Sequence, residues 1–268
     1  MNKNLNRREF VKAAGTAAVA LALPAGCQQN TTAKYGPNKN KKHIVTISFD
    51  DGYEKSSIRQ AEIYEKYNLS ACINVIASGH LGRFNSSGKR PNTRRGDFVL
   101  WNELKERGHE IMPHSYKHAN LKSVPYNQAK NLIIRCLDYF AEKLDGFDAM
   151  KSIYNFAYNA STAELEAWLS TKVKAFRTAG GGINPMPYKG QVKLTCTGPG
   201  RDNCEKHLDN WIEKLLAKES GWLIYNGHGL DGQGWGPMQA EYLDKLLERL
   251  LNIDSVAVLP VAPALATV

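Results

Sequence analysis

Two groups of ionisable side chains have the residue types needed to bind a metal ion and to move a proton. The first is the adjacent pair Asp50 and Asp51, and the second is the pair His114 and His118. One carboxylate and two imidazoles form a set of ligands with open positions, which suits a catalytic Zn²⁺ ion. A second carboxylate beside such a site can accept a proton from water. Together the two pairs predict a catalytic metal site with a proton acceptor beside it.

The aspartate pair follows a segment that is typical of a buried strand. Residues 43–47 are almost all apolar and β-branched, as in strands of a parallel sheet that are covered on both faces. Gly52 then permits a turn that most residues resist. Ligands of α/β folds bind at this carboxyl edge of the sheet. Alone, an Asp-Asp-Gly run is more often a polar turn, so the histidines decide between the two interpretations.

The histidine pair is also expected at a strand end. His114 comes just after a predicted strand at residues 110–112, and its spacing of four from His118 predicts one shared helical face. A pair on a surface helix is the commoner case. However, two strand ends at one sheet edge would bring both pairs together. His228 follows a further predicted strand, and we interpret it as a proton donor to the leaving group. The alternative is a loop histidine among glycine-rich turns.

From residue 43 onward, apolar runs alternate with amphipathic helical patterns, which indicates an α/β fold. We see no repeat and no second domain boundary. A long surface loop is expected at residues 79–96. Strands are predicted at residues 43–47, 70–76, 110–112, 152–156, 175–178, 192–196, 222–225 and 256–259. Helices are predicted at residues 58–67, 100–107, 127–144, 162–169, 204–218 and 239–251.

The first 42 residues are predicted to lie outside the fold. Residues 1–26 have the order of an export signal, with a basic start that resembles a twin-arginine motif at Arg7 and Arg8. The segment before Cys27 resembles a lipobox, which would attach the protein to a membrane through a lipidated Cys27. Pro24 fits that pattern poorly, so cleavage without lipidation stays open, as does an amphipathic N-terminal helix. Residues 27–42 predict a disordered tether.

Charge and cysteine content narrow the function classes. The formal charge is +9, but eight basic residues and one acidic residue lie within residues 1–42, which leaves +2 for the remainder. A nearly neutral fold gives no reason to expect a nucleic-acid partner. The five cysteines form no Cys-x-x-Cys pair, so a thiolate zinc site is not predicted. Cys196 and Cys204 flank a turn-rich loop, and a disulfide between them stays open.

The two motifs resemble those of a known enzyme family. Ser-Phe-Asp-Asp-Gly at residues 48–52 and His-Ser-Tyr-Lys-His at residues 114–118 are similar to the first two motifs of the polysaccharide deacetylases, the family of chitin, peptidoglycan and xylan deacetylases. The resemblance implies a distorted (β/α) barrel as one catalytic domain at residues 43–268. It also implies the following roles: Asp51, His114 and His118 as metal ligands, Asp50 as general base and His228 as general acid.

The remaining motifs of the family match less well. The third, Arg-x-Pro-Tyr-Gly, corresponds here to Asn-Phe-Ala-Tyr-Asn at residues 155–159. Tyr158 can keep the family's role of stabilising the oxyanion, because a backbone N–H performs it. In the family, the arginine at the first position of this motif orients the base, and this chain has Asn155 at that position. Arg177, near the end of the next predicted strand, is our hypothesis for its replacement, with a surface or rim arginine as the alternative.

The fourth motif, an Asp and a Trp near the pocket, has only a loose counterpart at residues 209–211, and Trp222 and Trp235 are equally good candidates for a pocket wall. We predict a Zn²⁺-dependent hydrolase that removes N- or O-linked acetyl groups from a polysaccharide in the periplasm or at the cell surface. The alternatives are a catalytically silent carbohydrate-binding module of the same fold and an amidohydrolase of a small cyclic amide. The sequence leaves the oligomeric state open.

Overall fold

The computed structural model describes residues 41–81, 94–199 and 204–268. The predicted export signal, Cys27 and nearly all of the predicted tether lie outside these residues, as does most of the predicted loop at residues 79–96. Among the residues that the structure describes, no helix combines the length and apolar character needed to cross a membrane.

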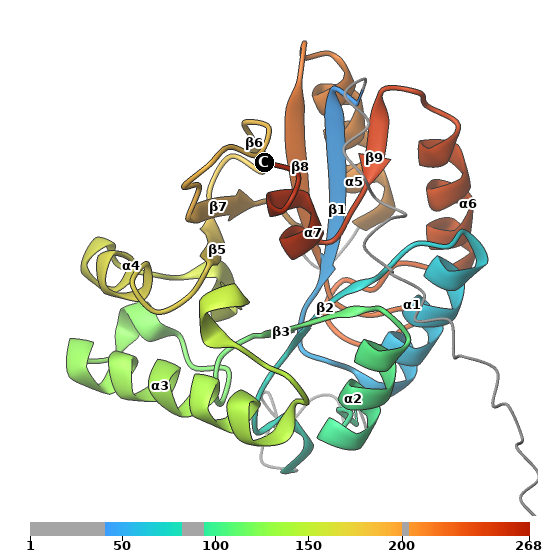
Figure 1. The fold of residues 1–268 in the computed structure, drawn as a ribbon. Helices are drawn as coiled ribbons and strands as arrows, with labels where there is room; N and C mark the ends of the chain where they lie inside the picture. The colour runs from blue at the N-terminus through green and yellow to red at the C-terminus, as the bar shows by residue number, and fades with distance from the viewer. Residues whose placement is uncertain (1–40, 82–93, 200–203) are drawn as a thin grey trace, which may run out of the picture. The chain divides into compact units, whose positions relative to one another are not determined.

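Strands and helices alternate along most of the described chain, as predicted, except that the three strands within residues 175–196 follow one another without a helix between them (Figure 1). The strands are β1 (His43–Phe49), β2 (Cys72–Val75), β3 (Glu110–Pro113), β4 (Ile153–Asn155), β5 (Ala175–Ala179), β6 (Ile183–Asn184), β7 (Lys193–Cys196), β8 (Gly221–Gly227) and β9 (Val256–Val258). The helices are α1 (Glu54–Lys66), α2 (Phe98–Glu106), α3 (Tyr126–Lys143), α4 (Ala163–Leu169), α5 (Cys204–Leu216), α6 (Ala240–Leu251) and α7 (Val261–Leu265). The short elements β6 and α7 were not predicted, and side-chain caps mark the start of helices α2 and α4. For example, the Asp97 side chain accepts hydrogen bonds from two backbone N–H groups at the start of α2.

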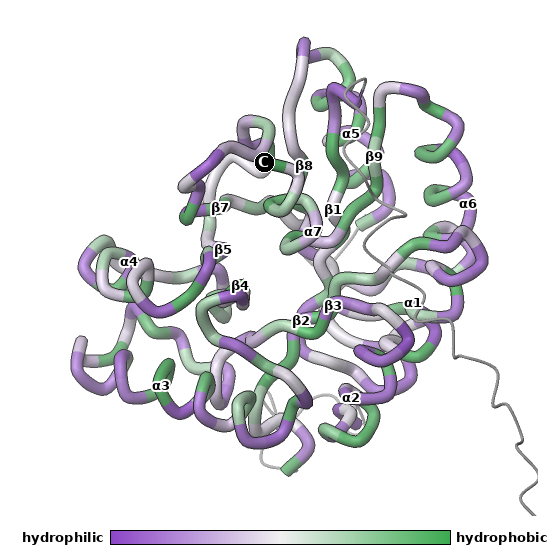
Figure 2. The backbone as a smooth tube through the Cα atoms, in the orientation of Figure 1, coloured by the Kyte–Doolittle hydropathy of each residue, from purple (hydrophilic) through white to green (hydrophobic). Residues whose placement is uncertain are grey.

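Seven strands form the wall of a distorted (β/α) barrel, which confirms the predicted fold class. The parallel strands β3, β2, β1 and β8 are hydrogen-bonded in that order, and β4, β5 and β7 form a second parallel set. A bridge between Thr197 and Tyr225 links the end of β7 to β8. The Asn155 amide donates to the Pro113 carbonyl across the boundary between β4 and β3. Figure 2 shows these strands arranged around one centre.

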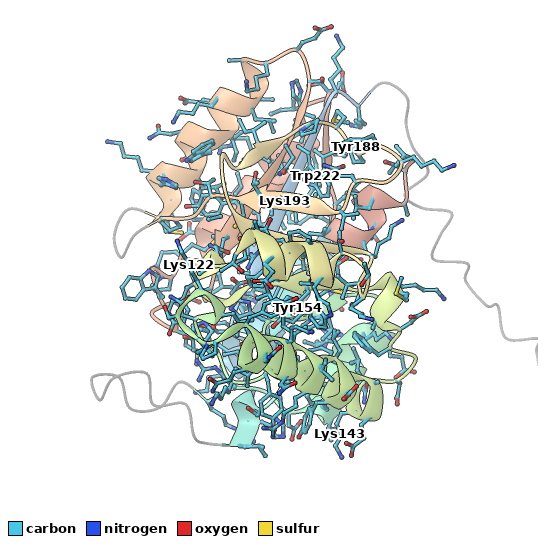
Figure 3. All side chains as sticks on the ribbon, turned by 90° about the vertical axis from the view of Figure 1, so that its left-hand side faces the viewer. Lys122, Lys143, Tyr154, Tyr188, Lys193 and Trp222 are labelled. Atoms are coloured by element: carbon cyan, nitrogen blue, oxygen red, sulfur yellow. The ribbon has the colours of Figure 1, made fainter. Side chains whose placement is uncertain are left out.

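Side-chain alternation separates two hydrophobic clusters. One lies inside the barrel, and each wall strand contributes to it or has a side chain packed against it, including Ile44 of β1 and Trp222 of β8. The other contains the intervening residues, such as Val45 and Leu223, packed against the helices. In Figure 3, Lys143 lies at the periphery, whereas the fully buried Trp222 lies among packed side chains.

The barrel interior changes from apolar to polar along its axis. Helix α7 closes the amino-terminal end, where Val261, Ala264 and Leu265 join the inner cluster. Towards the carboxyl end of β1, the inward positions are instead the buried polar residues Ser48 and Asp50. Buried polar groups require partners, so this end of the barrel must contain a hydrogen-bond network or bind a ligand.

Candidate active site

The aspartate pair lies at the carboxyl end of β1. The Asp50 N–H donates to the Gly227 carbonyl at 2.9 Å, so parallel pairing with β8 continues to this residue. Asp51 and Gly52 then take left-handed φ angles of 78° and 62°. Such a φ is unfavourable for aspartate and is often found where function requires it. Both carboxylates are buried, and the turn directs them into the barrel mouth.

The histidine pair begins directly after β3, but it does not lie on a helix, so that part of the prediction was wrong. The His114 N–H donates to the Val75 carbonyl at 2.8 Å, and the chain then forms a loop. Ser115 and His118 have φ angles of 65° and 52°, which a helix does not allow. The Ser115 hydroxyl accepts a hydrogen bond from the His118 N–H at 2.7 Å, which closes the loop. The ring centroids of His114 and His118 are 5.2 Å apart.

Asp51, His114 and His118 each place one ligand atom in a common cluster. All three atoms lie within 4.8 Å of one another. Asp51 Oδ1 is 3.2 Å from His118 Nε2 and 3.7 Å from His114 Nε2. The neighbouring strand ends of β1 and β3 thus bring the two sequence motifs together, with only β2 between their strands.

The bonding of these three residues fits a divalent metal ion. Asp51 Oδ2 accepts a hydrogen bond from the Tyr53 hydroxyl at 3.0 Å, whereas the buried Asp51 Oδ1 has no hydrogen-bond partner. His114 Nδ1 is 3.0 Å from the Asn155 carbonyl oxygen, which can only accept. The His114 proton therefore lies on Nδ1, and the Nε2 lone pair is directed at the cluster. Burial lowers the pKa of His114 to about 4, so this imidazole is neutral at neutral pH.

The second carboxylate, Asp50, is held by hydrogen bonds to both of its oxygens. Its Oδ1 accepts from the Asn74 amide at 2.7 Å, and its Oδ2 accepts from the Arg177 guanidinium at 2.6 Å. Burial alone would raise the pKa of Asp50, but Arg177, His114 and His228 outweigh it and hold that pKa below its ordinary value. Asp50 is therefore ionised at neutral pH.

The contact expected between Arg177 and Asp50 is present in the structure. Strand β5 pairs with β4 so that Arg177 lies directly opposite Asn155. Both side chains are buried, but only the guanidinium reaches the carboxylate. The Asn155 amide donates instead to Asn74 Oδ1 at 2.8 Å. The alternative of a surface or rim arginine does not apply, because Arg177 is fully buried.

Tyr158 and His228 are the remaining residues with predicted roles in the reaction. Tyr158 has a left-handed φ of 58°, and its ring, 62% exposed, is centred 4.6 Å from the His118 ring. His228 follows β8 and is half-buried, and its Nδ1 is buried without a hydrogen-bond partner. Its imidazole is near enough to act electrostatically on both carboxylates, and it contributes to the lowered pKa of Asp50 and of Asp51.

The candidates for the fourth family motif are dispersed. Asp209 lies on α5, where it accepts hydrogen bonds from Tyr242 and Arg249. Trp222 belongs to the inner core, and its indole N–H donates to Thr46. Trp235, 44% exposed, lies in the loop that follows His228. Trp222 is thus a core residue and not a pocket wall.

Sequence reasoning missed Asn74 and Tyr53, which contact the two site carboxylates. A signal for Asn74 existed, because it is the one amide in the otherwise apolar or thiol-bearing segment 71–76.

The question of a disulfide is answered by the structure, in which Cys196 and Cys204 are free thiols. They belong to different hydrophobic clusters, one inside the barrel and one outside it.

Comparison with known proteins agrees with this geometry. The family profile described as polysaccharide deacetylase matches residues 37–197, which is more than half of the chain. A bifunctional xylanase/deacetylase of Pseudobutyrivibrio xylanivorans is 25% identical over 116 residues, which are 43% of this chain and 17% of that protein. The chain therefore spans about a sixth of the length of this curated relative.

Two solved structures with the same fold have different polysaccharides in their names. One is a family 4 acetyl xylan esterase from Clostridium thermocellum in complex with a cobalt ion, with a TM-score of 0.54, 15% identity and coverage of 83% of this chain and 90% of that one. The other is a peptidoglycan deacetylase from Bacillus subtilis, with a TM-score of 0.53, 14% identity and coverage of 85% and 92%.

Proposed function

Because the chain belongs to the polysaccharide deacetylase family, a family of hydrolases, we propose that it removes acetyl groups from an extracytoplasmic polysaccharide in a metal-dependent reaction. One observation carries the proposal. Asp51 Oδ1 is buried without a hydrogen-bond partner and faces two imidazole nitrogens, while Asp50 is held beside it by a buried arginine. Burying charged groups costs stability, and carboxylates and imidazoles with shifted pKa values cluster at functional sites.

Asp51, His114 and His118 would hold the metal ion, for which we propose Zn²⁺. A divalent metal at this position supplies Lewis-acid polarisation of the acetyl carbonyl and lowers the pKa of water. The protein's part is to fix the ligands. The Asn155 carbonyl holds the His114 ring, and the Tyr53 hydroxyl holds the Asp51 carboxylate.

Asp50 would act as general base. Its Oδ2 lies 3.6 Å from His114 Nε2, so the base is at the edge of the ligand cluster without being part of it. Arg177 keeps the carboxylate ionised and ready to accept a proton from water. The same guanidinium lowers the basicity of Asp50, so the arrangement favours a defined position over a high proton affinity.

Tyr158 and His228 would complete the reaction. The backbone N–H of Tyr158 would donate to the oxyanion of the tetrahedral intermediate. His228 would protonate the departing amine or alkoxide. Amide and ester substrates need the same four roles, and both an acetyl xylan esterase and a peptidoglycan deacetylase share this fold. We therefore propose acetylated polysaccharide as the substrate class, with N- or O-linked acetyl groups.

We place the reaction outside the cytoplasm because residues 1–26 have the order of a twin-arginine export signal before Cys27. This proposal is tested by cell fractionation of a variant in which Arg7 and Arg8 are both replaced by lysine. Export through that route predicts that the precursor accumulates in the cytoplasm. An unchanged distribution would contradict it.

The enzymatic proposal is tested by acetate release from acetylated xylan, chitin oligosaccharides and peptidoglycan. The protein is first treated with a chelator, dialysed and then assayed with and without added Zn²⁺. We expect release from at least one glycan only after metal is restored, and no release by His118→Ala under the same conditions. Equal release by the metal-free protein would contradict the metal dependence. No release from any glycan would favour the silent carbohydrate-binding module.

A further inference from the structure

Asn74 is a buried amide at the centre of the hydrogen-bond network inside the barrel. Its Nδ2 lies 2.7 Å from Asp50 Oδ1 and 2.6 Å from the Ser48 hydroxyl oxygen. Its Oδ1 accepts a hydrogen bond from the Asn155 amide at 2.8 Å. Strand β2 places it between the strands that carry the aspartate and histidine pairs. Asn74 is fully buried and has a partner on both ends of its amide.

The direction of these hydrogen bonds follows from the chemistry of Asp50. An ionised carboxylate can only accept, so the Asn74 NH₂ must face Asp50 and its carbonyl must face Asn155. The Asn155 NH₂ must then face Asn74, where it also lies 3.1 Å from the Ile153 carbonyl oxygen. Each amide orientation is therefore determined by its neighbour, and the series begins at the carboxylate.

Asn155 links this series to the histidines. Its side chain donates to Asn74, while its backbone carbonyl accepts the Nδ1 proton of His114. One residue of β4 thus contacts both the amide that holds Asp50 and the ring that faces Asp51. Asn155 and Asn74 thus form a hydrogen-bonded connection between Asp50 and His114, whose Nε2 lies 3.6 Å from Asp50 Oδ2.

We propose that Asn74 and Asn155 are positioning residues, which fix the plane of the Asp50 carboxylate relative to the His114 imidazole. The proposal rests on the proposed role of Asp50 as base. Arg177 holds Oδ2 but cannot by itself stop rotation of the carboxylate about that contact. Asn74 supplies the second point of attachment, on Oδ1. The buried charges of Asp50 and Arg177 already balance each other, and a neutral amide supplies this contact without adding a further charge.

The test compares Asn74→Leu with a matched control, Thr46→Val. Leucine has the same number and branching of side-chain heavy atoms as asparagine but has no hydrogen-bonding groups. Thr46 is also fully buried inside the barrel and makes two hydrogen bonds, to Trp222 and to the Leu259 carbonyl, none of which involves Asp50. Both substitutions therefore remove buried hydrogen bonds from the barrel interior. Asn155→Leu is a second variant with the same expectation, in case Asn74→Leu does not fold.

Two measurements are made on each variant. The first is a crystal structure, in which Asn74→Leu should show a rotated Asp50 carboxylate and Thr46→Val should not. The second is steady-state kinetics, in which Asn74→Leu should lower kcat about 10- to 100-fold, as expected for a misplaced catalytic group, with KM within about twofold of the wild type. Metal content should stay equal to that of the wild type, because Asp51, His114 and His118 are unchanged. The double variant Asn74→Leu/Asn155→Leu should be no worse than either single variant, because both act on one contact.

Each alternative outcome overturns the positioning role. An unrotated carboxylate in Asn74→Leu would show that Arg177 alone orients Asp50, whatever happens to kcat. Equal losses of kcat in Asn74→Leu and Thr46→Val would indicate a general packing effect. If the wild type releases no acetate from any glycan, the proposed function fails. The carboxylate orientation in the crystals would still decide the positioning role.

Discussion

The barrel buries a carboxylate near each of its ends, and the two have opposite surroundings. Asp50, at the carboxyl end, is paired with the Arg177 guanidinium at 2.6 Å. Glu110, at the start of β3, accepts hydrogen bonds from the Ala262 N–H at 2.6 Å, the Val261 N–H at 3.1 Å and the Cys72 thiol at 3.0 Å. No positively charged side chain among the described residues is paired with Glu110.

Their pKa values shift in opposite directions for this reason. Burial raises the pKa of both acids. For Asp50, Arg177 and two histidines reverse the effect, whereas for Glu110 the Cys72 thiol and the two N–H donors only reduce it and the pKa remains raised. Burial also raises the pKa of the Cys72 thiol, so the thiol keeps its proton and donates. Glu110 serves to hold α7 across the barrel end, and Asp50 is kept charged beside the ligand cluster.

The comparison shows that burial alone does not identify a reactive carboxylate. Two features distinguish Asp50 from Glu110, a buried guanidinium partner and neighbouring groups without partners of their own. Asp51 Oδ1 and His228 Nδ1 are buried without hydrogen-bond partners near Asp50, whereas the oxygens of Glu110 are satisfied by backbone and thiol donors. Unsatisfied groups next to a charged pair therefore indicate where a ligand binds.

The largest expected effect separates the two adjacent aspartates. Asp51→Asn should lose bound metal and all measurable activity, because an amide oxygen is a poor replacement for a carboxylate ligand. Asp50→Asn should keep its metal and lose about 10²–10⁴-fold in turnover, the usual contribution of a general base. Elemental analysis and acetate release on the same samples check both expectations. Equal metal loss in the two variants would contradict this division of roles.

The next effect concerns the guanidinium. Arg177→Met should lower the free energy of unfolding by about 3–5 kcal/mol, because it leaves the buried Asp50 charge without its partner. Turnover should fall as well, while metal content should not change, since Arg177 contacts none of the three ligands by hydrogen bond. Urea unfolding and elemental analysis measure the two quantities.

A matched control for this variant is Arg59→Met, which removes an exposed ion pair with Glu62 on helix α1. It should change the unfolding free energy by about 0.5 kcal/mol or less. If Arg177→Met were no more destabilising than this control, the buried ion pair would contribute little to the stability of the barrel.

Much of the fold was predictable because the signals were local. The wall strands are apolar runs, and the helices have one apolar face, as α3 does with Leu132, Ile133 and Phe140 buried. Helix α7 was not predictable in this way. It has five residues, includes a proline, and its first N–H groups are satisfied by Glu110, which is about 150 positions earlier in the chain.

The site was predictable where it depends on strand ends. Asp50, Asp51 and His114 each follow a strand, and neighbouring parallel strands end at one edge. The helical placement of the histidines was wrong because positive φ angles at Ser115 and His118 leave no trace in residue spacing. The roles of Asn74 and Glu110 were missed because each depends on what lies across the barrel, which one strand's sequence does not contain.

The smallest expected effect sharpens the comparison from the Glu110 side. Glu110→Gln replaces one oxygen by an NH₂ group, which cannot accept from α7, so one backbone N–H loses its acceptor. We expect a loss of about 1–2 kcal/mol in unfolding free energy at pH 5.

The raised pKa of Glu110 means that the folded wild type binds a proton more tightly than the unfolded chain does. Wild-type stability therefore falls as the pH rises from about 4.5 through the raised pKa. The glutamine side chain of the variant does not titrate, so the deficit of the variant should shrink between pH 5 and pH 8. Urea unfolding at both pH values measures it, and a deficit that grows with pH would show that Glu110 is stabilised as the charged form, as Asp50 is.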